Sequence, residues 1–182
     1  MNLPNKLTML RIILIPVFLV LVLVDRIPMH YLWSLIVFLA ACITDTLDGN
    51  IARKRNLVTD FGKLMDPLAD KLLVMSALVA FIPVAGVPVW VVVVILGREF
   101  MVTSLRLIAA GKGVVIAADK WGKIKTISQM VWLNYTLLML WLFPEAGWAH
   151  ILFVVLMGIV VATTVLSGAN YMLKNKALYS DR

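Results

Sequence analysis

Residues 45–70 read DTLDGNIARKRNLVTDFGKLMDPLAD and place four aspartates in one short stretch of a very apolar chain. They are Asp45, Asp48, Asp66 and Asp70. Removing a carboxylate from water costs free energy, so acidic residues beside membrane spans are rare unless they line a wet cavity, pair with a cation or hold a metal. We therefore expect the functional site in this stretch.

The composition of the whole chain excludes an ordinary soluble domain. Of 182 residues, 62% are hydrophobic and only 15% are charged, and the mean hydropathy is +0.96. A chain of this length has room for about six helical crossings of ~20 residues each. We predict an all-α integral membrane protein in which residues 1–182 form one six-helix transmembrane bundle. Apolar runs between polar or Pro/Gly-rich segments place the spans at 7–24, 31–52, 64–82, 88–110, 123–143 and 148–172.

Lysines and arginines predict how the bundle lies in the membrane. They cluster at the start of the chain and after the second, fourth and sixth spans, whereas the intervening loops carry only Arg26. Because such residues accumulate in cytoplasmic loops, we expect both termini in the cytoplasm of a multi-pass cell-membrane protein. The aspartates then lie at the cytoplasmic ends of the second and third spans. We expect the net charge of +7 to lie on the face that meets anionic lipid headgroups, and we expect no nucleic-acid partner.

The spacing of the aspartates favours a metal site. Asp45 and Asp48 are three residues apart, Asp66 and Asp70 are four apart, and each pair therefore shares one helix face. Crowded carboxylates repel one another unless divalent cations compensate their charge. Hard oxygen ligands with almost no His or Cys nearby favour Mg²⁺ or Mn²⁺ over zinc. We predict two such ions.

The aspartates and their small neighbours carry a resemblance to a known family. Gly49, Ala52 and Gly62 allow close approach of a ligand or a neighbouring helix, and plain helix packing is an equal alternative for each. The pattern resembles the complete signature of the CDP-alcohol phosphotransferase family, in the order Asp45-x-x-Asp48-Gly49-x-x-Ala52-Arg53, eight residues, Gly62-x-x-x-Asp66-x-x-x-Asp70.

The resemblance implies a reaction and a role for each residue. Members of this family are six-helix membrane enzymes, commonly homodimers, that transfer a phosphatidyl group from a CDP-linked lipid to an alcohol and release CMP. By the resemblance, Asp70 is the general base and can also touch the metal, while the other three aspartates are principally metal ligands. The residues that would shape the nucleotide site are Gly49, Ala52, Arg53, Thr59 and Gly62.

Basic residues later in the chain suggest a site for a phosphorylated acceptor. In the fourth span we expect Arg98, Glu99 and Arg106 to face the interior of the bundle, since Glu99 and Arg106 nearly superpose on a helix. At the start of the fifth span, Lys125 and Gln129 share a face. Arginine and lysine bind phosphate oxygens well, so we predict a phosphate pocket that includes Arg98, Arg106, Lys120, Lys123 and Lys125.

Two structural alternatives compete with that pocket. Arg98 and Glu99 could instead form a buried structural ion pair. Arg106 and the lysines from Lys120 to Lys125 could instead serve only to orient the protein in the membrane.

Three segments resemble the branch of the family that makes phosphatidylglycerophosphate, which implies CDP-diacylglycerol as donor and sn-glycerol 3-phosphate as acceptor. They are Gly97-Arg98-Glu99-Phe100, Lys120-Trp121-Gly122-Lys123-Ile124-Lys125-Thr126 and Pro4-Asn5-x-Leu7-Thr8-x-x-Arg11. Cardiolipin synthases that use phosphatidylglycerol, and inositol-phosphate transferases, are alternatives within the family. A membrane prenyltransferase would need more spans than this chain supplies. A cation transporter would carry its acidic residues nearer mid-membrane.

Overall fold

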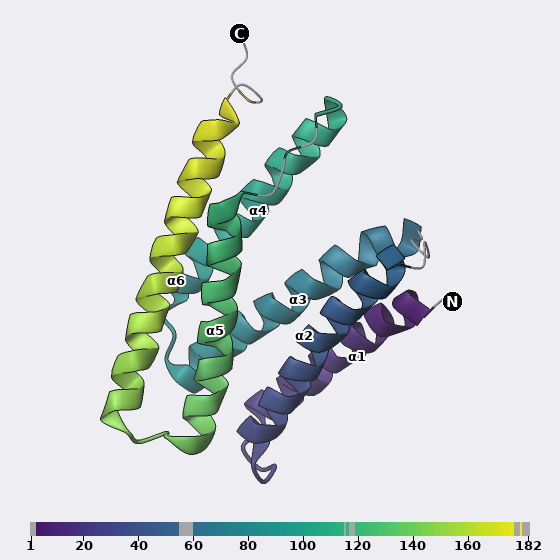
Figure 1. Cartoon of the computed structure of the whole chain (residues 1–182). Helices are drawn as coiled ribbons and strands as arrows, with labels where there is room; N and C mark the ends of the chain where they lie inside the picture. Colours follow the sequence, from purple (N-terminus) through teal and green to yellow (C-terminus); the bar gives the residue numbers. More distant parts are fainter. Residues whose placement is uncertain (1–2, 55–59, 115, 117–118, 177–178, 180–182) are drawn as a thin grey trace. The chain divides into compact units, whose positions relative to one another are not determined.

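The described part of the chain folds into six helices, which Figure 1 labels in the computed structural model. The structure describes residues 3–54, 60–114, 116, 119–176 and 179, apart from the side chains of 3, 4, 45–54, 60, 61, 63 and 64, and within this part it has no strand. The helices are α1 Leu3–Leu23, α2 His30–Lys54, α3 Asp60–Ala85, α4 Val89–Gly111, α5 Lys120–Leu142 and α6 Gly147–Lys174. Each expected span matches one helix, so the all-α prediction is confirmed.

Three helices are long and apolar enough to cross a membrane by length and composition. A transmembrane helix needs about 20 predominantly apolar residues to span the ~30 Å hydrocarbon core. Within the described part of the chain, the segments that meet this requirement are Asn5–Leu23, Met65–Ala85 and Gly147–Lys174, and His30–Thr44 forms a shorter apolar helix. The chain therefore has the helices of a membrane protein.

The turn between α3 and α4 is set by glycine and proline. Gly86 has φ +65°, a conformation that glycine adopts without steric cost, and it follows the last residue of α3. Pro88 then stands at the N-cap of α4 with extended backbone angles, where its missing N–H costs no helical hydrogen bond. Pro83, which follows the expected span 64–82, lies inside α3.

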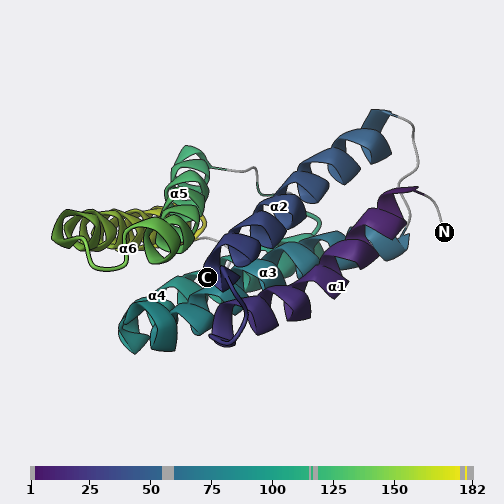
Figure 2. The same cartoon turned by 90° about the horizontal axis from the view of Figure 1, so that it is seen from below.

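The first compact unit comprises Met1–Gly86 together with Thr136–Pro144. In it α1 packs against both α2 and α3, and Phe18 and Phe38 are fully buried with their ring centroids 5.6 Å apart. The start of α1, the end of α2 and the start of α3 lie at the same end of this unit, as Figures 1 and 2 show. This arrangement brings the N-terminal polar residues of α1 to the aspartate-bearing ends of the other two helices.

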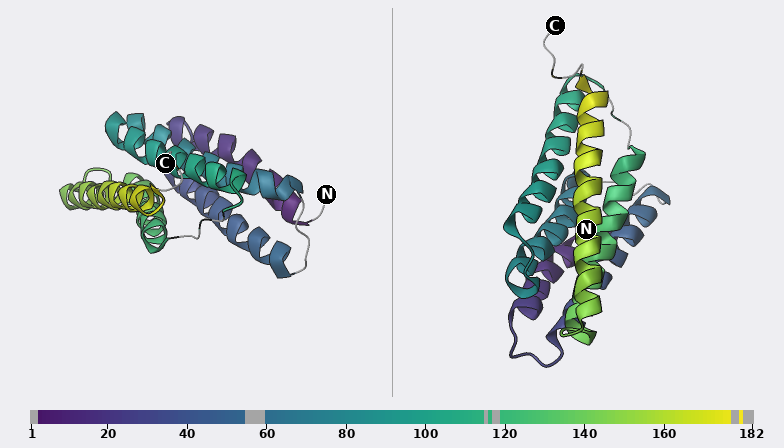
Figure 3. Two further views of the ribbon diagram at one scale, coloured as in Figure 1. Left: turned by 90° about the horizontal axis from the view of Figure 1, so that it is seen from above. Right: turned by 90° about the vertical axis from the view of Figure 1, so that its left-hand side faces the viewer.

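The second compact unit comprises Val87–Tyr135 and Glu145–Arg182. In it α4 and α6 run side by side, as the right-hand view of Figure 3 shows. Tyr135 on α5 donates a hydrogen bond of 2.9 Å to the backbone oxygen of Ala149 at the start of α6. Gly168 on α6 is buried against α4, because a Cβ built there would lie 3.2 Å from Arg98 Cγ and 3.3 Å from Met101 Cε.

Gly168→Val is expected to destabilise the second unit by about 1–3 kcal/mol, because the added methyl groups would press on Arg98 and Met101. Thermal unfolding in detergent measures the change. Gly158→Val on the same helix is the matched control, since a Cβ at Gly158 meets no described atom within 4 Å beyond its own stretch of helix. Equal melting temperatures for the two variants would contradict the close packing of α4 on α6.

Candidate functional site

Asp66 and Asp70 lie one turn apart on α3, and both are half-buried. The hydroxyl Oγ1 of Thr8 on α1 donates a hydrogen bond of 2.5 Å to Asp66 Oδ1. Gly62, in the first turn of the same helix, is buried, as expected for a small residue at a close approach. The first unit therefore places the second aspartate pair on one helix face, with Asp66 in contact with α1.

The other half of the predicted aspartate site lies outside the described side chains. The backbone of α2 runs as a helix to Lys54, so these positions belong to its last turns. Their side chains lie outside the part of the chain that the structure describes, and so does the whole of Thr59. The predicted site residues concerned on α2 are Asp45, Asp48, Gly49, Ala52 and Arg53.

The donor set fits a hard divalent cation. Asp66 and Asp70 offer carboxylate oxygens from consecutive turns of α3, and oxygen donors of this kind are the ligands that Mg²⁺ and Mn²⁺ prefer. Among the side chains that the structure describes, no three His, Cys, Asp or Glu residues come together, and those of Asp45 and Asp48 are not in that set. The metal site therefore remains a prediction. The two aspartates whose side chains the structure describes, Asp66 and Asp70, carry suitable oxygen donors.

A buried polar face on α1 adds residues that the sequence did not assign to the site. Asn5, Thr8 and Arg11 are each less than 9% exposed, although they sit in a mostly apolar helix. The guanidinium Nε of Arg11 donates to the backbone oxygen of Ala41 on α2 over 3.3 Å. Successive members of this set are three residues apart, which puts them on one helix face. This spacing could have indicated the buried polar face from the sequence.

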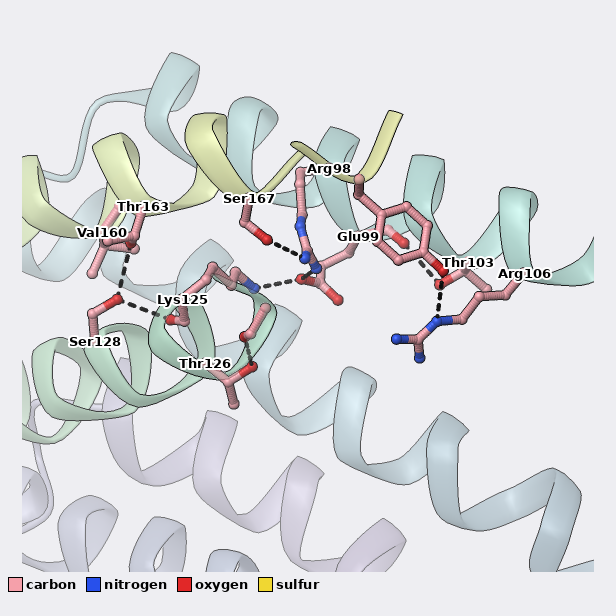
Figure 4. Close-up of polar contacts among 12 residues, drawn as sticks. Arg98, Glu99, Thr103, Arg106, Lys125, Thr126, Ser128, Val160, Thr163 and Ser167 are labelled. Atoms are coloured by element: carbon pink, nitrogen blue, oxygen red, sulfur yellow. Dashed lines mark hydrogen bonds and ion pairs between the residues drawn. The ribbon is translucent and has the colours of Figure 1, made fainter. Parts of the chain in front are cut away.

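A cluster of charged side chains in the second unit joins α4, α5 and α6 (Figure 4). Glu99 Oε1 accepts hydrogen bonds from Arg98 Nη1, over 3.0 Å, and from Lys125 Nζ. Arg98 Nη2 also donates to Ser167 Oγ over 2.6 Å. The side chains of Arg98 and Lys125 are only 11% and 4% exposed, so the cluster is largely removed from solvent. Two cations share one carboxylate, and these three ionised groups together carry a net charge of +1.

Polar groups next to this cluster have hydrogen-bonding capacity to spare. Gln129, one turn from Lys125 on α5, is buried as the shared face predicted, and its Nε2 has no partner among the described residues. Arg98 Nε is also buried without a described partner. Because an unsatisfied buried donor costs free energy, these groups suit a site that receives a polar ligand or water.

The remaining predicted phosphate-binding residues lie apart from the buried cluster. Arg106 is exposed, which corrects the expectation that it faces the interior, and its Nε donates to the Tyr171 hydroxyl over 3.1 Å. Lys120 and Lys123 are exposed at the start of α5. Of the five basic residues predicted for the pocket, the structure therefore brings only Arg98 and Lys125 together.

Asp119 is a further residue that the sequence left unassigned. It accepts hydrogen bonds from Asn170 Nδ2 and, over 3.1 Å, from Lys174 Nζ on α6, and it directly precedes α5. These bonds tie the start of α5 to the end of α6 and so hold the helix that carries Lys125.

Comparison with known proteins identifies related sequences. The profile of the CDP-alcohol phosphatidyltransferase family matches residues 1–166. A Bacillus subtilis (strain 168) protein named CDP-diacylglycerol–glycerol-3-phosphate 3-phosphatidyltransferase is 44% identical over 190 residues, covering 96% of this chain and 95% of the relative. A Mycobacterium tuberculosis (strain H37Rv) protein named probable phosphatidylglycerophosphate synthase is 39% identical, covering 94% of this chain and 80% of the relative. These matches confirm the resemblance that the aspartate pattern indicated.

Proposed function

Because the chain belongs to the CDP-alcohol phosphatidyltransferase family, we propose that it transfers the phosphatidyl group of CDP-diacylglycerol to sn-glycerol 3-phosphate. The products are phosphatidylglycerophosphate and CMP. The observation that carries this proposal is the match to the Bacillus subtilis relative, which is named for this reaction and aligns over nearly the full length of both chains.

The reaction needs an acceptor hydroxyl, a base and a leaving group. The hydroxyl oxygen of glycerol 3-phosphate attacks the phosphorus of the phosphatidyl group, and the bond from that phosphorus to the oxygen of CMP breaks. CMP leaves with the electron pair, and Asp70 accepts the proton of the attacking hydroxyl. We favour this direct transfer over a covalent intermediate because residues 45–70, which carry the aspartates, contain no Ser, Cys or His.

A divalent cation, Mg²⁺ or Mn²⁺, belongs to this proposal. We expect two such ions. Their ligands would be the carboxylate oxygens of Asp45, Asp48, Asp66 and Asp70. When bound, such ions neutralise the charge of the pyrophosphate and of the departing CMP. The nucleotide itself would lie against the remaining signature residues, which are Gly49, Ala52, Arg53, Thr59 and Gly62.

The acceptor phosphate would bind at the cluster of Arg98 and Lys125. Glu99 holds both cations in place while leaving the three groups a positive net charge, which suits a phosphate and not a neutral alcohol. Arg98 fits both the structural ion pair and the phosphate pocket, since it pairs with Glu99 and keeps a buried Nε donor. We propose that the exposed side chains of Arg106, Lys120 and Lys123 attract anionic substrates toward the cluster.

The membrane arrangement that goes with this function has six crossings and cytoplasmic termini. Its support is the placement of lysine and arginine, which follow the positive-inside pattern. The aspartate stretch then opens to the cytoplasm of a cell-membrane enzyme made of one membrane domain, residues 1–182. A homodimer completes the proposal and rests on the family resemblance alone.

CMP release tests the proposed function. Purified protein in liposomes with CDP-diacylglycerol and Mg²⁺ is expected to release CMP with glycerol 3-phosphate, and not with inositol phosphate, serine or phosphatidylglycerol. Release only with phosphatidylglycerol would identify a cardiolipin synthase, and release only with inositol phosphate would identify that other branch. The absence of CMP with every acceptor would refute the family reaction for this chain.

A further inference from the structure

We propose that Thr8 on α1 is a positioning residue that orients the carboxylate of Asp66 for metal binding. The inference deepens the proposed function and rests on its assignment of Asp66 to the metal site. Thr8 itself would touch neither the reacting atoms nor the ion. Its effect would pass through Asp66.

The hydrogen bond between Thr8 and Asp66 has the geometry for such a role. Thr8 is 1% exposed, and its Oγ1 lies 2.5 Å from Asp66 Oδ1. A hydroxyl has one proton to donate, so this bond engages one carboxylate oxygen and restrains rotation of the group. The two residues are 58 positions apart, so the bond also fixes α1 to α3 at the level of the aspartate pair.

A second contact from the same face of α1 reaches the other aspartate-bearing helix. Arg11, three residues after Thr8, is fully buried, and its Nε donates to the backbone oxygen of Ala41 on α2. Ala41 precedes Asp45 by four residues, which is the spacing at which a helical carbonyl accepts the N–H of the later residue. One face of α1 therefore contacts α3 at Asp66 and α2 one turn before Asp45.

The expected size of the effect follows from the behaviour of other metal sites. Groups that hydrogen-bond to metal ligands hold those ligands in orientation, and their loss typically costs 10–100-fold in metal affinity or activity. Thr8→Val keeps the shape of the side chain but removes the donor. We expect it to weaken Mn²⁺ binding about ten-fold, at the low end of that range, because Asp66 would be one of several ligands.

Mn²⁺ titration followed by electron paramagnetic resonance provides a readout that needs no substrate. Thr8→Val should bind Mn²⁺ more weakly, whereas Thr8→Ser, which restores the hydroxyl, should bind close to the wild-type affinity. Thr163→Val is the matched control, because its hydroxyl bonds to Ile159 O on its own helix and to Ser128 in the second unit. In an Asp66→Asn background, Thr8→Val should cause no further weakening, since the two residues act through one interaction.

Each other outcome has a defined meaning. Unchanged Mn²⁺ affinity in folded Thr8→Val, additive weakening with Asp66→Asn, or no Mn²⁺ binding by the wild type would overturn the proposal. Normal Mn²⁺ binding with abolished CMP release would point instead to a role of Thr8 in substrate binding or in the chemical step. Thr8→Ala, which lacks the donor and is smaller, is the second variant, and misfolding of both would show a purely structural role. A wild type that binds Mn²⁺ without releasing CMP would refute the proposed function alone.

Discussion

Replacing Asp70 by asparagine is expected to lower the rate of CMP release about a thousand-fold, which is within the usual contribution of a general base. Asparagine has nearly the same shape as aspartate but cannot accept the proton of the acceptor hydroxyl. Much of the binding of CDP-diacylglycerol should survive, because the other signature residues remain. Single-turnover CMP release and equilibrium binding of the CDP-lipid, measured on the same preparation, separate the two effects.

The control for this variant is Asp25→Asn, which removes an exposed carboxylate from the segment between α1 and α2. It should leave CMP release unchanged. An Asp70→Asn enzyme of near-normal activity would remove Asp70 from the base role. A variant that loses CDP-lipid binding together with turnover would instead make Asp70 principally a metal ligand.

The second large effect is expected at Lys125, where Lys125→Gln should raise the KM for glycerol 3-phosphate about 10–100-fold. Hydrogen bonds to charged groups contribute about 1.5–3 kcal/mol, and each 1.4 kcal/mol is a factor of ten in affinity. The substitution also reduces the net charge of the cluster with Arg98 and Glu99 from +1 to zero. Initial rates of CMP release at varied acceptor concentration measure the change, and the KM for CDP-diacylglycerol should hardly move.

Lys176→Gln removes one exposed lysine after the end of α6 and serves as the charge-matched control. If both variants raise the acceptor KM equally, the attraction is a general surface effect and the cluster is not the phosphate site. If Lys125→Gln lowers only the melting temperature, the contact between Lys125 and Glu99 is structural. The two results are distinguishable because KM and thermal stability are measured independently.

The helices of this protein could be predicted from sequence because hydropathy alone marks long apolar runs. The predicted spans and the observed helices differ at the polar ends of the helices. The expected third span began at residue 64, whereas α3 begins at Asp60 and so also includes the charged residues Asp60 and Lys63. Backbone hydrogen bonding continues a helix into polar residues, so the helices extend beyond the apolar runs that mark them.

The candidate site was harder to predict, because its contacts join residues far apart in the chain. Spacing placed Asp66 and Asp70 on one face of a helix, but it could not show that Thr8 lies against Asp66. The same limit explains why the prediction that Arg106 faces the interior was wrong. Its seven-residue spacing from Glu99 correctly implies a similar direction, but two turns further along α4 the side chain is exposed and bonds to Tyr171.

The buried guanidinium of Arg11 also bears on how the chain enters the bilayer during synthesis. An arginine at the centre of an inserting helix costs about 2.5–3.5 kcal/mol on scales derived from translocon insertion. Arg11 lies within the apolar stretch Asn5–Leu23, and it reaches the carbonyl of Ala41 only once α2 is present. Burial of the Arg11 guanidinium therefore depends on α2, and the first helix gains this partner only after the second has been made.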